Sequence, residues 1–216
     1  KTPVYPVANF GSQMAPLYTI LALWVGSILM VVSMRSDVTD SNVAEGLAED
    51  DPLRAALTAK PLRLATGFLG RYLIFGTIAL AQATLVGLGD LFFLKVQHAH
   101  PLEFMGTLWL TAVVFSFLLY TLIATFGNAG KALGVLFLVL QISGAGGSFP
   151  LAILPSFFSS VSPFLPATHA IVALRASIAG YSGHEYGDAM WFLASFILFA
   201  AFLGLALRPL LVRGNR

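Results

Sequence analysis

The feature that most restricts the fold is a run of 43 residues, from Ala132 to Leu174, without any Asp, Glu, Lys or Arg. A small soluble core could not absorb so long an uncharged segment, so it belongs in or against a lipid bilayer. Four prolines interrupt its second half: Pro150, Pro155, Pro163 and Pro166. An interior proline removes a backbone donor and clashes with the preceding turn. We therefore expect one spanning helix followed by broken helical pieces.

The rest of the chain has the same membrane character. It is 57% hydrophobic and 10% charged, whereas a soluble domain carries roughly 25% charged residues. A helix needs roughly 20 apolar residues to cross the bilayer core. Five stretches fit this requirement: 16–34, 72–94, 104–126, 132–149 and 190–207. We expect an all-α integral membrane protein whose residues 1–216 form a single membrane domain.

The distribution of basic residues predicts the orientation in the membrane. Nine of the twelve Lys and Arg residues fall on one side of the five spans, and the positive-inside rule places that side in the cytoplasm. The first residue is then outside and the carboxyl tail is cytoplasmic. The start of the sequence lacks a basic region followed by an apolar core. We therefore expect an earlier span upstream, which would give six in the intact protein.

The predicted cytoplasmic loop, residues 35–71, has helix signals of its own. Asp51 and Pro52 supply an N-cap and a first-turn proline, and Lys60-Pro61 begins a second helix that runs into the next span. Both helices are expected to lie along the inner leaflet. The loop is either simply solvated or a docking surface for a cytosolic partner. The docking candidates are Leu53, Arg54, Ala56, Leu57 and Lys60.

On the opposite side, residues 150–188 are expected to form two short helices. The first begins at Pro155 and ends before Pro163. The second begins at Thr168, a good N-cap, and ends at Gly180. Both are too short to cross the bilayer, so they should lie in or under the outer headgroup layer.

One glycine-rich segment superficially suggests a phosphate-binding loop. The segment Gly127-Asn-Ala-Gly-Lys131 lacks the first glycine of that motif and the Ser or Thr that follows its lysine. A tight turn between two spans explains its glycines. The chain therefore has no P-loop of its own with which to hydrolyse ATP.

Other motifs for catalysis or metal binding carry little weight. His98, His100 and Glu103 could bind zinc, but their spacing selects no geometry, and polar loop residues are the simpler interpretation. Zero cysteines exclude disulfides and thiolate chemistry, and no Ser-His motif is present. We predict no enzyme, no metal and no cofactor. A net charge of only +2 gives no support for a nucleic-acid partner.

Few polar side chains fall within the predicted spans. Gln82, Gln141 and Ser143 should face other helices, where they either bridge helices or line a translocation path. Asp90 is the only acid inside a predicted span. Because it lies near the outer boundary, we expect it to reach the headgroups, and no series of intramembrane acids suggests a proton pump.

Two groups of residues carry a family resemblance over nearly the whole chain. The opening segments are Val4-Tyr-Pro-Val-Ala-Asn-Phe-Gly-Ser12, Ala15-Pro16 and Leu23-Trp24-Val-Gly26. They resemble the membrane portion of the YhgE/Pip (phage infection protein) family. The second group is Phe149-Pro150, Leu154-Pro155, Pro163, Pro166-Ala-Thr168, Ala173-Leu174-Arg175 and Gly180. It is similar to the signature of the membrane domains of type-2 ABC exporters.

The resemblance implies a bacterial plasma-membrane permease. It implies six spans, a large extracellular domain after the first, a separate cytosolic ATPase that docks on the inner-face helix at residues 51–59, and a dimer. The substrate would be an amphipathic or envelope-associated molecule. A different interpretation is a membrane scaffold that does not transport, either a type VII-like secretion accessory or a phage-adsorption anchor.

Overall fold

In the computed structural model, the described residues are 7, 9–34, 46–52, 54, 64–147, 153–181 and 183–207. Within these ranges the regular structure is helical, without strands. The elements are α1 (Phe10–Ser33), α4 (Leu64–Leu88), the π-helix η1 (Gly89–Phe93), α5 (Pro101–Phe126), α6 (Asn128–Gly144), α7 (Ser156–Val161), the 3₁₀-helix η3 (Ser162–Phe164), α8 (Pro166–Ala179), α9 (Glu185–Phe202) and the π-helix η4 (Leu203–Leu207). The predicted all-α fold is confirmed.

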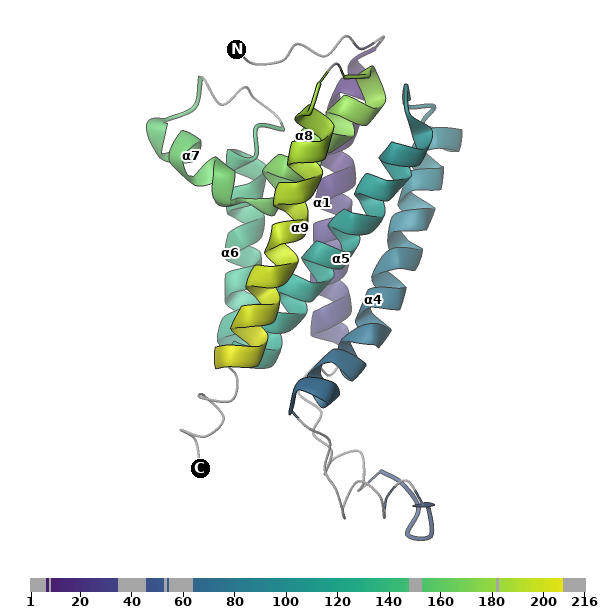
Figure 1. Ribbon diagram of the computed structural model, residues 1–216, viewed down its shortest axis with the longest axis vertical. Helices are drawn as coiled ribbons and strands as arrows, with labels where there is room; N and C mark the ends of the chain where they lie inside the picture. Colours follow the sequence, from purple (N-terminus) through teal and green to yellow (C-terminus); the bar gives the residue numbers. More distant parts are fainter. Residues whose placement is uncertain are drawn as a thin grey trace.

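The helices α1, α4, α6, α8 and α9 pack around α5 (Figure 1). In α5, 78% of the most apolar window is buried inside the protein, compared with 44% in α1, 28% in α4 and 22% in α9. The outer faces of α4 and α9 expose large apolar side chains such as Leu73, Leu85, Leu198 and Phe202. A soluble protein could not leave so much apolar surface in water. The protein is therefore a multi-pass membrane protein.

Four helices in the described ranges are long and apolar enough to cross a membrane: Phe10–Ser33, Thr66–Phe93, Pro101–Phe126 and Glu185–Leu205. They overlap the first, second, third and fifth predicted spans. The fourth predicted span, 132–149, corresponds to α6, which has 17 residues. A helix of that length measures roughly 25 Å, somewhat less than a bilayer core of about 30 Å.

The amino-terminal helix begins before its predicted span. The side chain of Asn9 accepts a hydrogen bond from the Ser12 backbone N–H at 2.8 Å, which caps α1 at Phe10. Pro16, where the span was expected to begin, lies inside the helix. α4 begins at Leu64, so it continues from the loop side into the second span without a break.

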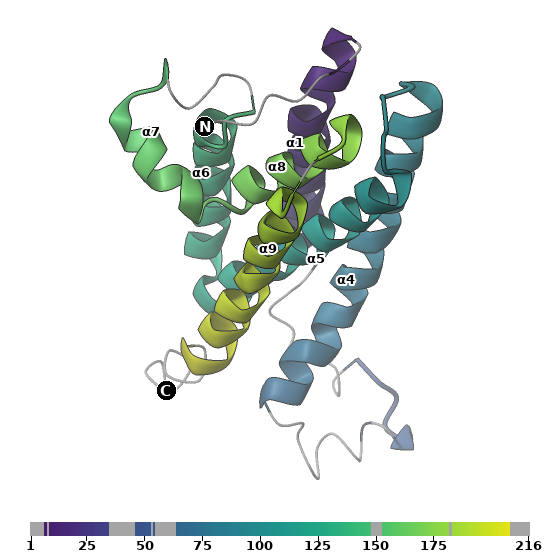
Figure 2. The same cartoon turned by 45° about the horizontal axis from the view of Figure 1, so that its top comes forward.

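The proline-broken stretch folds as two helical pieces bent by 82° from each other, Ser156–Phe164 and Pro166–Ala179 (Figure 1). Figure 2 shows α7 standing beside α6, while α8 lies among the long helices. α8 begins at Pro166 rather than at the predicted Thr168, because a proline fits the first helical position, where its missing N–H is not needed. It ends at Gly180, as predicted, with a φ of 83°.

Aromatic contacts hold α5 in the centre of the bundle. Trp24 of α1 meets Phe115 edge to face with ring centroids 4.7 Å apart. Tyr72 of α4 meets Phe117 of α5 in the same way at 4.6 Å. Such pairs add to the packing of the rings themselves. They fix α1 and α4 on α5, and thereby position the polar groups between these helices.

Candidate functional site

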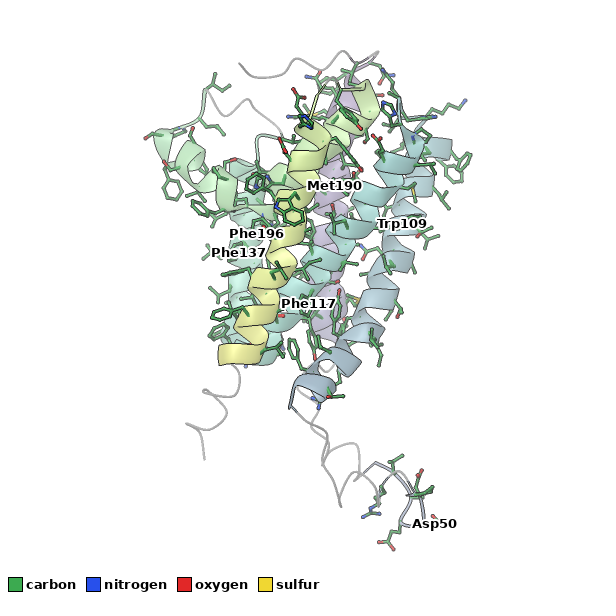
Figure 3. All side chains as sticks on the ribbon, in the orientation of Figure 1. Asp50, Trp109, Phe117, Phe137, Met190 and Phe196 are labelled. Atoms are coloured by element: carbon green, nitrogen blue, oxygen red, sulfur yellow. The ribbon has the colours of Figure 1, made fainter. Side chains whose placement is uncertain are left out.

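Polar side chains in the bundle mainly join one helix to another. Tyr120 of α5 donates to the Phe68 carbonyl of α4 at 3.0 Å. Trp109, which lies on α5 beside α4 (Figure 3), donates from Nε1 to the Thr84 hydroxyl at 3.0 Å. Polar groups in hydrocarbon are costly unless they find partners, so such bonds favour helix association.

Gln82 joins α4 to α1. Its Nε2 donates to the Ala22 carbonyl of α1 at 3.1 Å. A Cβ at Gly26 would overlap the Gln82 amide, so this glycine gives the amide its space. The geometry accords with the helix-bridging interpretation. The role of Gln82 in a translocation path stays a prediction.

Gln141 and Ser143 lie on different faces of α6. Gln141 is 5% exposed, and its Oε1 accepts a hydrogen bond from the Ala167 backbone N–H of α8 at 3.1 Å. Ser143 is exposed. The partners of Gln82 and Gln141 are on different helices, so these bonds do not join the two amides in one site. The path role of Gln141 and Ser143 is likewise still a prediction.

Asp90 lies inside the bundle and does not reach outward as expected. It is 6% exposed, and its Oδ2 accepts a hydrogen bond from the Thr19 hydroxyl of α1 at 2.6 Å. Asp90 belongs to η1, where the helix widens into a π turn. The expectation that it meets the headgroups is wrong, because the packing of α1 against this turn encloses the carboxyl group. Nothing in the sequence pairs residues 19 and 90.

A polar cluster joins the amino ends of α5 and α9. Tyr181 donates to Glu103 Oε1 at 3.0 Å, and Tyr186 donates to the Glu103 backbone carbonyl at 3.1 Å. The two tyrosine rings stack with centroids 5.4 Å apart. The hydrogen bond to Glu103, then burial and the Glu103 charge, raise the pKa of Tyr181 above its ordinary value. Spacing alone gave no signal for this cluster.

The histidines considered for zinc have other surroundings. His98 Nδ1 lies 2.9 Å from the Val96 carbonyl oxygen, and the His100 ring lies 5.5 Å from the Tyr181 ring. Within the described ranges, no group of three His, Cys, Asp or Glu side chains could hold a metal ion.

The glycine-rich segment forms the predicted tight turn between α5 and α6. Gly127 has a φ of 58°, which is easily adopted only by glycine. A Cβ at Gly130 would collide with the Leu122 carbonyl of α5, so this glycine allows the two helices to approach closely.

Comparison with known proteins identifies the family. The family described as ABC-2 family transporter protein matches residues 4–207. The chain belongs to the ABC-2 transporter family. This match confirms the resemblance to type-2 ABC membrane domains.

One relative confirms the nearer resemblance. The protein "Uncharacterized protein YhgE" of Bacillus subtilis (strain 168) is 26% identical over 204 residues. The alignment covers 94% of this ABC-2 chain and 24% of the relative, so the chain spans about a quarter of the relative's length. No solved structure matches.

The ATPase-docking candidates of this ABC-2 chain lie mostly outside the described residues. Leu53, Ala56, Leu57 and Lys60 are in that group. Arg54 is described, and its guanidinium lies 3.5 Å from the Leu47 carbonyl oxygen. The docking surface therefore stays a prediction.

Proposed function

We propose that the chain is the membrane permease part of an ABC-2 exporter. It would move an amphipathic or envelope-associated substrate across the bacterial plasma membrane, using a separate cytosolic ATPase. The observation that carries the proposal is the family match over residues 4–207. The segment Gly127–Lys131 does not match a phosphate-binding loop, so the proposal assigns ATP hydrolysis to a part outside residues 1–216.

The proposed arrangement is a dimer with the amino end outside and the carboxyl tail in the cytoplasm. The distribution of basic residues supports this orientation. Ser143 is a polar group on the exposed surface of α6, where it would be available to line a path between two copies. Gln82 would tie α4 to α1, and Gln141 would tie α6 to α8.

Affinity purification of the intact protein from its native membrane tests this function. A stoichiometric P-loop ATPase should co-purify with the wild type and be lost with the double variant Leu53→Asp/Leu57→Asp, because charges would disrupt an apolar docking face. The control is His98→Asp/His184→Asp, which adds charge at two exposed positions at the opposite end of α4 and α9. This control should retain the ATPase.

The competing scaffold function makes a different prediction for the same experiment. A secretion accessory or phage-adsorption anchor would co-purify with envelope components and no ATPase. That result, or an ATPase that binds both double variants equally, would refute the proposed docking and the exporter with it.

A further inference from the structure

The end of α4 that continues into the π-helix η1 carries an exposed apolar group with a cation beside it. The consecutive side chains of Phe92, Phe93 and Leu94 are between 70% and 88% exposed. Lys95 follows them directly and is exposed as well. Both views place α4 at the edge of the bundle (Figure 1 and Figure 2). This group therefore faces the surroundings of the protein.

Lys95 has a backbone conformation that suits glycine. Its φ is 48°, in the left-handed region that is unfavourable for a residue with a Cβ. The flanking N–H groups of Leu94 and Val96 donate to carbonyls of η1 at 3.0 Å and end the helix. Glycine is the usual residue at such a helix end. A lysine here strains the turn, and we expect an interaction of its side chain to offset that strain.

The described part of the chain does not supply that interaction. Within the described ranges, no hydrogen bond or ion pair joins the Lys95 side chain to another residue. Asp90 is the only acid between residues 72 and 94. Its carboxyl group is buried and accepts a hydrogen bond from Thr19. The Lys95 ammonium group is therefore open to an anion outside these residues.

The spacing of charges along α4 places Lys95 at the boundary of the bilayer. Its sequence separation from Arg71 corresponds to a rise of roughly 36 Å in a helix. The hydrocarbon core is about 30 Å thick, so both charges can lie just beyond it, and long basic side chains extend to the headgroups. Residues 92–94 then lie at the edge of the hydrocarbon, beside acyl chains.

The apolar group is continuous with the lipid-facing side of α4. Leu85, Leu88 and Phe92 are exposed and lie three and four residues apart, a spacing that puts them on one face of the helix. No charged residue lies between this face and Lys95 except the buried Asp90. A phospholipid suits both parts of the surface, because its acyl chains match the apolar side chains and its phosphate has the charge opposite to that of Lys95.

We propose that residues 92–95 form a phospholipid-binding site, in which the Lys95 ammonium group contacts the phosphate and Phe92, Phe93 and Leu94 contact the acyl chains. Binding does not require that the protein transports anything, and it does not depend on which side of the membrane this end of α4 faces. The proposal can therefore fail or hold independently of the proposed exporter function.

Fluorescence quenching by brominated lipids tests the site in the whole chain. The chain has no cysteine, so Phe93→Cys provides a single thiol for a fluorophore beside Lys95. The labelled protein is placed in phosphatidylcholine bilayers that contain increasing amounts of brominated phosphatidylglycerol, or of brominated diacylglycerol with the same acyl chains and no phosphate. At this position phosphatidylglycerol should bind about fivefold more strongly than diacylglycerol, the factor expected for one lysine near lipid phosphates.

Two variants and one control position separate the charge from the backbone and from general lipid contact. Lys95→Gly removes the ammonium group and suits the left-handed turn, so the fold should remain while the fivefold preference falls to about one. Lys95→Arg keeps a cation and should keep the preference. The control label at Leu85→Cys lies on the lipid-facing side of α4, roughly 15 Å along the helix from Lys95, and should show no preference in either background.

Three results would overturn the proposal. Equal binding of the two lipids beside the native Lys95 would refute the phosphate contact. An unchanged preference in Lys95→Gly would assign the phosphate contact to another group. Quenching at Leu85→Cys but not at Phe93→Cys would show that no acyl chain reaches residues 92–94. If Lys95→Gly is poorly folded, Lys95→Asn replaces it, because asparagine also tolerates this backbone region.

Discussion

α7 and all but the last five residues of α8 come from the same uncharged, proline-broken stretch, yet their surroundings are opposite. No residue of α7 is buried, whereas nine of the fourteen residues of α8 are. α8 packs against α1, α5 and α9, while α7 lies beside α6 and η3. Alanines recur at every third position of α8, at 167, 170, 173 and 176, and small side chains allow helices to approach closely. The absence of charge directs a segment to the membrane, but side-chain size decides whether it meets protein.

Thiol labelling should give the largest difference between the two helices. The chain has no cysteine, so Ser160→Cys in α7 and Ser177→Cys in α8 each introduce a unique thiol. Ser160 is exposed and Ser177 is fully buried. A membrane-impermeant maleimide should react with the α7 thiol about tenfold faster or more, since the buried site requires local opening.

The same labelling tests the orientation. On intact cells, the α7 thiol should react from outside if residues 150–188 lie on the outer face. Equal rates at both positions would show that α8 is not held in the bundle. Reaction of the α7 thiol only after cell lysis would reverse the predicted orientation.

Truncating one side chain in each helix should lower the free energy of unfolding more in α8 than in α7. Leu174 of α8 is fully buried, and Phe157 of α7 is 58% exposed. Leu174→Ala should lower the free energy of unfolding by about 2 kcal/mol. This value lies near the lower end for buried leucines, because unfolding in a membrane or detergent exposes the side chain partly to apolar surroundings rather than to water. Phe157→Ala should change it little. Thermal unfolding in mild detergent measures both, and a larger loss for Phe157→Ala would contradict the burial of α8.

The sequence predicted which segments are helical, but it did not predict which helices contact one another. The uncharged run and its prolines predicted two short pieces after α6, and Gly180 marked the end of α8. The pattern could not show that α8 enters the bundle, because the faces of α1, α5 and α9 that receive it are distant in sequence. The prediction for Asp90 was wrong for the same reason, since the Thr19 hydroxyl that donates to its carboxyl group comes from another helix.

The polar candidates illustrate the same limit. Composition predicted that Gln82, Gln141 and Ser143 face other helices; Gln82 and Gln141 do so, whereas Ser143 is exposed. It could not identify their partners, Ala22 and Ala167, because these are backbone groups of other helices. Nearly every residue has a backbone N–H and a carbonyl group, so the sequence does not show which of them will pair with a given side chain.

Removal of the Gln141 amide should weaken α8 by a smaller amount than loss of Leu174. Gln141 Oε1 supplies the acceptor for an N–H in the first turn of α8, whose own N-cap residue, Leu165, makes no side-chain bond. Gln141→Leu should therefore cost about 1 kcal/mol in the free energy of unfolding, as loss of a helix cap does. Ser143→Ala, exposed on the same helix, is the control and should change stability by less than about 0.5 kcal/mol. An equal effect of the two variants would show that the amide does not cap α8.

The smallest expected change in the free energy of unfolding comes from a hydrogen bond at the bend between α7 and α8. The Ser162 and Thr168 hydroxyls are 3.1 Å apart and join η3 to the first turn of α8. Thr168→Val keeps the shape of the side chain and removes this bond, at a cost of about 0.5 kcal/mol, because the Ser162 hydroxyl can rotate to another acceptor. A double-mutant cycle with Ser162→Ala isolates the contribution of the pair. A coupling energy near 0.5 kcal/mol would show that this hydrogen bond stabilises the bend, whereas a coupling energy of zero would show that it does not.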